Sequence, residues 1–183
     1  MKNVVLASAV VLAMAAVPAA AQYGQKKATT KGTTTSDQHF VTDVANVGMA
    51  EVELGKLAAD KASNDQVKKF GQRMADDHAK AGDELKALAE KNNLTWPTEL
   101  DAKHKAVRDR FSKLTGESFD RAYMQEMVNG HRAAVNTFKM EAKNGKTPEI
   151  QTWASKTLTT IEDHLKQAQE IARGVVGTTG TKK

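Results

Sequence analysis

The stretch Arg73–Leu85, RMADDHAKAGDEL, decides the fold, because its apolar residues return at helical spacing. Met74, Ala81 and Leu85 fall on one face of a helix, as do Val67 and Phe70 just before them. At about 100 degrees per residue, His78 lies within about 45 degrees of the centre of this apolar face. The sequence therefore predicts a long helix that carries a histidine into the protein interior.

Three more long helices are predicted around this one. The first begins at Ser36 or Asp37, either of which can cap it, and ends near Ala62. The motif SND at Ser63–Asp65 then caps the second helix, which ends near Lys91 before NNLTWP. Gly48 and Gly55 in the first helix are interpreted as notches that let a neighbouring helix approach closely.

The second half of the chain repeats this plan. Ser118 can cap a helix that runs to Asn144, with Gly145 just after its end. Thr147 and Pro148 open the last helix, which we expect to stop at Gly174. A short helix over residues 101–114 fits the long connection between the two pairs. Two helical hairpins joined by one long crossover predict an all-α, ferritin-like four-helix bundle, and an up-down bundle is the alternative.

The two ends of the chain have other compositions. Residues 1–21 combine one Lys, an apolar run and a small-residue cleavage site, which is typical of a secretory signal peptide. Residues 22–36 are rich in Gly, Thr and Lys, and residues 174–183 resemble them, so we expect a disordered linker and tail. The bundle domain is then 37–173. No transmembrane span is expected in the mature chain, and we expect it outside the inner membrane, in the periplasm or associated with the outer membrane.

The formal net charge of +5 does not belong to the predicted domain. The excess of Lys and Arg lies in the signal peptide, the linker and the tail, which leaves the domain close to neutral. Nucleic-acid binding is therefore not expected, because it needs clustered basic residues on the domain itself. The chain has no Cys, so disulfides cannot stabilise an exported form and packing must do so.

One polar residue on each long helix points toward the predicted bundle axis. His131 and His164 lie about 45 and about 55 degrees from the centres of their apolar faces, and Glu51 lies about 30 degrees from that of the first helix. Each of these residues and His78 is roughly 13 to 16 positions from the start of its helix, so all four fall near the middle of the bundle. The sequence predicts one polar layer made of Glu51, His78, His131 and His164.

Two hypotheses for this layer remain open. Three imidazoles and a carboxylate can hold a divalent metal such as Zn, Fe or Cu, and the methionines nearby add soft ligands suited to copper. Alternatively, Glu51 accepts hydrogen bonds from histidines in a structural network that fixes the register of the bundle. The Glu-x-x-His pairs of di-iron bundles are missing, because Ala75, Val128 and Ile161 stand three positions before the histidines.

Three segments carry a family resemblance: Gly48–His78, Phe119–His131 and Ile161–Leu165. Together they resemble a bacterial family of exported, ferritin-like helical proteins called domain of unknown function 4142, some of which are labelled predicted outer-membrane proteins. The resemblance covers about residues 37–172 and implies that the Glu51, His78, His131 and His164 layer belongs to the family design. It implies no activity. Gly130 and Thr159 depart from the family pattern, where an acidic or polar residue and a proline are expected.

Enzyme activity has no support in the sequence. There is no Cys nucleophile, no glycine-rich phosphate loop and no recognisable Ser, His and Asp signature. Carboxylate pairs such as Asp76 with Asp77 are interpreted as solvated helix surface. The two functions that remain are a non-enzymatic envelope protein that acts through an unknown envelope protein or surface, and a metal-binding bundle. The sequence does not indicate an oligomeric state.

Overall fold

The protein is described by a computed structural model that covers residues 35–177, with side chains from 36 to 175. It contains five helices in this part of the chain: α1 (Thr35–Lys61), α2 (Asp65–Lys91), α3 (Ala102–Ser112), α4 (Gly116–Asn144) and α5 (Pro148–Gly177). The predicted signal peptide, nearly all of the linker and the last six residues of the tail lie outside the described residues.

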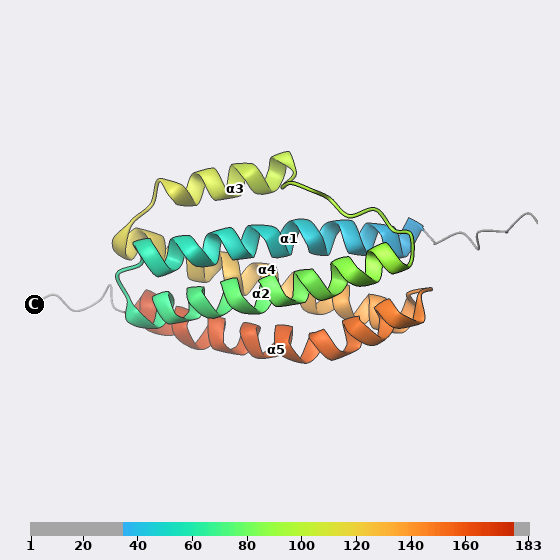
Figure 1. Cartoon of the computed structure of the whole chain (residues 1–183). Coiled ribbons are helices and arrows are strands. Elements are labelled where there is room, and N and C mark those ends of the chain that lie inside the picture. Colours follow the sequence, from blue (N-terminus) through green and yellow to red (C-terminus); the bar gives the residue numbers. More distant parts are fainter. Residues whose placement is uncertain (1–34, 178–183) are drawn as a thin grey trace, which may run out of the picture.

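The four long helices run side by side as two hairpins (Figure 1). α1 packs chiefly against α2 and α4 against α5, and the contacts between the two hairpins are fewer. α3 lies on the outer side of α1, within the crossover between α2 and α4. The predicted all-α bundle with a short extra helix in the long crossover is thus confirmed, and this connectivity is that of ferritin-like bundles. None of the described helices combines the length and the apolar character needed to cross a membrane.

Two predicted helix ends were wrong. α4 begins at Gly116 with Thr115 at the capping position, and the Ser118 hydroxyl only donates to the Thr115 carbonyl oxygen. Gly116 has a φ of 59°, a left-handed conformation that glycine adopts without steric cost, so the chain can turn into the helix there. α5 continues past Gly174 to Gly177, because Val175 is buried and burial outweighs the weak helix propensity of one glycine.

Asp37, which the sequence suggested as a cap of its own helix, binds the start of another helix. Its carboxylate accepts hydrogen bonds from the backbone N–H groups of Lys146 and Thr147 and from the Thr147 hydroxyl, at 2.7 to 3.2 Å. These groups precede α5, so a residue of the first hairpin caps a helix of the second.

Asp120 makes the reciprocal contact. From α4 it accepts hydrogen bonds from the Ser63 and Asn64 backbone N–H groups, at 3.1 and 3.0 Å, and from the Ser63 hydroxyl. Asn64 in turn caps α2 with its own side chain. Each hairpin is therefore tied to the other at the loop that opens its second helix.

Helix packing within the first hairpin depends on one of the two predicted notches. A Cβ atom at Gly55 would lie 2.4 Å from the Gly71 carbonyl oxygen, so α1 and α2 approach too closely there for any side chain. Gly48 was wrongly interpreted as a second notch, because a Cβ atom there would meet nothing within 4 Å.

Replacing Asp120 by Ala should destabilise the bundle, because three donors of the loop before α2 lose their acceptor at once. We expect a loss of about 2 to 4 kcal/mol in the free energy of unfolding, measured by urea denaturation. Asp83, exposed on α2, provides the matched control, and Asp83→Ala should change it by less than about 0.5 kcal/mol. Equal losses in both variants would show that the capping contact contributes nothing.

Glu141, near Asp37 at one end of the bundle, makes the stability of the folded state depend on pH. Burial, and secondarily the nearby Asp37 charge, raise the pKa of Glu141 to about 7. The folded state therefore holds this proton more tightly than the unfolded state, and stability is lost as pH rises from about 4.5 toward 7. Glu141→Gln should raise the melting temperature at pH 8, where the wild-type residue is charged, and change it little at pH 5. A melting temperature that rises equally at both pH values would contradict this assignment.

Candidate metal centre

The four polar residues predicted from the helical faces lie together in the middle of the bundle. Glu51 comes from α1, His78 from α2, His131 from α4 and His164 from α5, and their exposed fractions are 6, 9, 0 and 1%. They separate two hydrophobic clusters, one around Phe119 and Tyr123 and the other around Phe40, Phe138 and Trp153. A polar layer thus interrupts an otherwise apolar core.

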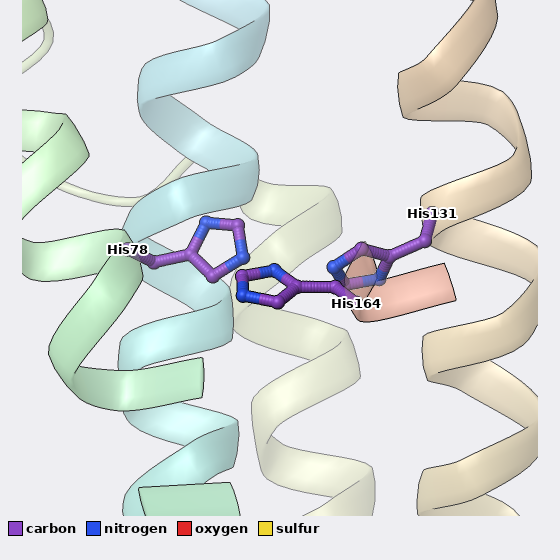
Figure 2. A group of neighbouring side chains, drawn as sticks. All are labelled: His78, His131 and His164. Atoms are coloured by element: carbon purple, nitrogen blue, oxygen red, sulfur yellow. The ribbon is translucent and has the colours of Figure 1, made fainter. Parts of the chain in front are cut away.

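The three imidazole rings face one another (Figure 2). Their centroids are 5.7 Å apart for His78 and His131, 5.5 Å for His78 and His164, and 5.4 Å for His131 and His164. One nitrogen from each ring lies within 4.8 Å of the other two. Because Zn–N bonds of about 2.0 to 2.1 Å put the nitrogens of a tetrahedral site about 3.4 Å apart, the distances between these nitrogens need to shorten by about 1.5 Å or less for the rings to share an ion.

A backbone carbonyl fixes the tautomer of His131. Its Nδ1 lies 2.9 Å from the Met127 carbonyl oxygen, one helical turn earlier. A carbonyl oxygen can only accept, so Nδ1 carries the hydrogen. In the neutral ring, Nε2 then has a free lone pair, and this buried atom has no hydrogen-bond partner within the described part of the chain.

A carboxylate fixes His164 in the opposite tautomer. Its Nε2 lies 2.8 Å from Asp77 Oδ2, which also accepts a hydrogen bond from Arg73 Nε at 3.1 Å. The ring therefore donates through Nε2, and Nδ1 keeps its lone pair, again without a partner among residues 36–175. Burial lowers the pKa of His164 to about 4 against the opposing effect of Asp77, so the ring is neutral at pH 7. A carboxylate behind an imidazole is a common arrangement in metal sites, where it orients the ring and strengthens the ligand.

Asp77 itself is a residue that the sequence interpretation missed. Burial favours its protonated form, but hydrogen bonds from His164 and Arg73 outweigh this and lower the pKa of Asp77. It was grouped with Asp76 as solvated surface, and Asp76 does lie on the surface. The signal was present, because Asp77 flanks the apolar face of α2 instead of pointing away from it.

Glu51 lies between two of the histidines. Its Oε2 is 3.1 Å from His78 Nε2 and its Oε1 is 3.5 Å from His131 Nδ1. The approach to His78 Nε2 is not in hydrogen-bond geometry, so this nitrogen also stays unpartnered within the described residues. Burial lowers the pKa of His78 despite the nearby Glu51 carboxylate. Glu51 is not part of the three-nitrogen cluster, but it is placed to orient His78 or to move in as a fourth ligand.

The methionines that suggested a copper site do not belong to the cluster of histidine nitrogens. The side chains of Met74, Met124 and Met127 belong to the buried hydrophobic cluster around Phe119 and Tyr123. Met140 is exposed. The cluster of metal-ligating atoms in the described part of the chain therefore consists of imidazole nitrogens.

The sequence profile of one family, described as "Domain of unknown function (DUF4142)", matches residues 22–171. The chain belongs to this family. The match includes all four residues of the polar layer and gives the family no stated activity. Comparison with curated proteins finds no match.

Two solved structures have a similar fold. A DUF305 fragment from Deinococcus radiodurans aligns with a TM-score of 0.65 and 14% identity, over 76% of this chain and 97% of that one. A DUF305 protein from Streptomyces coelicolor, described as secreted, aligns with a TM-score of 0.66 and 15% identity, over 80% of this chain and 96% of that one. At such low identity the likeness concerns the fold alone.

His78→Ala should destabilise the metal-free domain by about 1 to 3 kcal/mol, because it leaves a cavity and removes the ring beside the buried Glu51 carboxylate. Chemical denaturation in excess chelator measures this loss. His39→Ala, on the exposed side of α1, is the control and should change the free energy of unfolding by less than about 0.5 kcal/mol. Unchanged unfolding of the His78 variant would mean that this ring contributes nothing to the core.

Proposed function

We propose that the domain binds one divalent transition-metal ion through His78, His131 and His164. Two observations support this proposal most strongly: one nitrogen of each buried ring lies within 4.8 Å of the other two, and each ring has one buried nitrogen without a hydrogen-bond partner among the described residues. The ion would sit in the polar layer, between the two hydrophobic clusters.

A purely structural network explains less of this geometry. It accounts for Glu51 between His78 and His131, and for the Asp77 contact with His164. It leaves one buried nitrogen of each ring without a partner among the described residues, and each unsatisfied buried polar group costs about 1 to 3 kcal/mol. One bound ion would use one nitrogen from each ring. A trapped water molecule can also satisfy some of these nitrogens, and a measurement of bound Zn²⁺ distinguishes a metal site from a water site.

The donor set favours Zn²⁺ as the first ion to test. Three neutral imidazoles with a carboxylate nearby suit a four-coordinate site, with Glu51 or a water molecule in the fourth position. Cu(I) is disfavoured because the methionine side chains of the core pack with apolar residues. A di-iron centre is disfavoured because no Glu-x-x-His pair supplies bridging carboxylates.

We also propose that the domain acts outside the cytoplasm, in the periplasm or at the envelope. The signal-peptide pattern of residues 1–21 supports this, and so does the fold it shares with a protein described as secreted. A bundle without cysteines keeps its ligands in an oxidising compartment, because imidazole is not lost to disulfide formation. We expect the metal-loaded form to be the one that meets an envelope protein or surface there.

Equilibrium dialysis of the mature chain, purified without a histidine tag and stripped with a chelator, tests the metal proposal. We expect one Zn²⁺ per chain and a rise in stability of about 2.7 kcal/mol when free Zn²⁺ is 100 times its dissociation constant. The double variant His131→Ala and His164→Ala should lose this binding, because it removes two of the three nitrogen ligands.

The matched control is His104→Ala. His104 is bonded to Asp101 at the start of α3, outside the polar layer, and its loss should leave the stoichiometry at one. The metal proposal would be contradicted if the wild-type chain bound no Zn²⁺, or if the wild-type chain, the double variant and His104→Ala bound it equally. The structural network would then be the better explanation of the polar layer.

A further inference from the structure

A pocket of about 950 Å³ lies between the two hairpins and reaches α3 and the segment before it. Its inner wall is formed by apolar side chains of the cluster around Phe40, Phe138 and Trp153, among them Leu85 and Ile161. The exposed residues Lys103 and Thr137 line the same space, so it opens to solvent. Protein interiors are usually close-packed, and this space persists because the two hairpins contact each other less than the helices within each hairpin do.

The pocket has one polar end inside the bundle. Glu51 and His78 line it there, and His131 and His164 are not among its lining residues. His78 Nε2 is buried without a hydrogen-bond partner among the described residues, beside a carboxylate that is 6% exposed. The pocket thus has apolar side chains on its inner wall, exposed charged residues such as Lys103 elsewhere in its lining, and an acceptor group at its inner end.

Gly130 keeps this polar end uncovered. It lines the pocket, and a Cβ atom at this position would lie 3.8 Å from Glu51 Oε1. A longer side chain would extend over the carboxylate.

The basic residues that line the pocket are either paired or exposed. Arg108 lies 3.5 Å from Glu53, and Lys105 lies 2.5 Å from Glu99, whereas Lys56, Lys86 and Lys103 are exposed to solvent. A charged ligand would have to lose its hydration among apolar walls, and an anion would also be repelled by the Glu51 carboxylate at the inner end. The walls therefore favour an uncharged molecule.

We propose that this pocket binds a neutral small molecule with an apolar body and a single O–H or N–H group that donates to Glu51. A carboxylate can only accept, so the matching head is a donor. The volume lies within the range of about 300 to 1,000 Å³ that small-molecule sites occupy. This site goes beyond the proposed metal ion and does not require one, because its contacts are with Glu51, His78 and the apolar wall.

The probe set is 4-ethylphenol, ethylbenzene and 4-ethylbenzoate, which share one body and differ in the head. Both tryptophans of the chain, Trp96 and Trp153, line the pocket, so intrinsic fluorescence reports binding, and calorimetry gives the stoichiometry. With the mature chain in excess chelator, we expect saturable one-to-one binding of 4-ethylphenol. Ethylbenzene should bind about tenfold more weakly because it lacks the donor, and 4-ethylbenzoate should not bind.

Gly130→Leu should weaken 4-ethylphenol binding at least about tenfold, because the new side chain projects toward Glu51. The matched control is Gly174→Leu, at an exposed helical glycine of α5 outside the pocket. Ala133→Phe is the second variant if Gly130→Leu does not fold. Ala133 is an exposed lining residue one turn away, so the larger side chain should fill part of the pocket and weaken 4-ethylphenol binding by a similar factor.

Two results would overturn the proposal: no saturable 4-ethylphenol binding to the wild-type chain, or equal affinity in the lining variant and in Gly174→Leu. Tighter binding of 4-ethylbenzoate than of 4-ethylphenol would also overturn it, because the site would then recognise an anion. These titrations contain no metal, so a failure of the metal proposal leaves their outcome unaffected.

Discussion

Two hydrogen bonds determine which histidine nitrogens at the centre of this bundle keep a lone pair for a ligand. One joins His131 Nδ1 to the Met127 carbonyl oxygen, and the other joins His164 Nε2 to Asp77. Both partners only accept, so each ring must give its hydrogen outward and keep a lone pair on its other nitrogen. Without these two contacts the rings could rotate or exchange tautomers, and the layer would be an ordinary set of buried polar groups. With them, each of these two rings keeps one unprotonated nitrogen inside the buried layer before any ion arrives.

The reciprocal aspartate contacts keep this layer in register. Asp37 fixes the start of α5 from the first hairpin, and Asp120 fixes the start of α2 from the second. Both contacts are at the ends of the bundle, whereas the histidines are near the middle of their helices. A slip of one hairpin along the other would break a capping contact and separate His78 from His131 and His164. The capping contacts and the polar layer therefore support the same alignment of four helices.

Helical periodicity was sufficient to predict the bundle and to bring Glu51, His78, His131 and His164 to one level. This worked because the position of a residue on a helix face, and its distance from the helix start, follow from geometry that does not depend on the neighbours. The roles of Asp37 and Asp120 could not be predicted in the same way. An aspartate near a helix start favours local capping, and only the packing of the other hairpin shows that Asp37 and Asp120 cap a distant helix. The pocket was equally hidden, because a volume between helices depends on how closely two hairpins approach.

The pocket and the polar layer lie next to each other in the bundle. A layer of buried polar groups in the core prevents the two hydrophobic clusters from merging, and the pocket ends where this layer begins. Nitrogen-15 NMR of the histidine rings tests the central claim most directly. In the metal-free chain, His131 Nε2 and His164 Nδ1 should resonate as unprotonated nitrogens, and both should shift when one equivalent of Zn²⁺ is added. Protonated signals at these two atoms, or signals that Zn²⁺ leaves unchanged, would contradict the account.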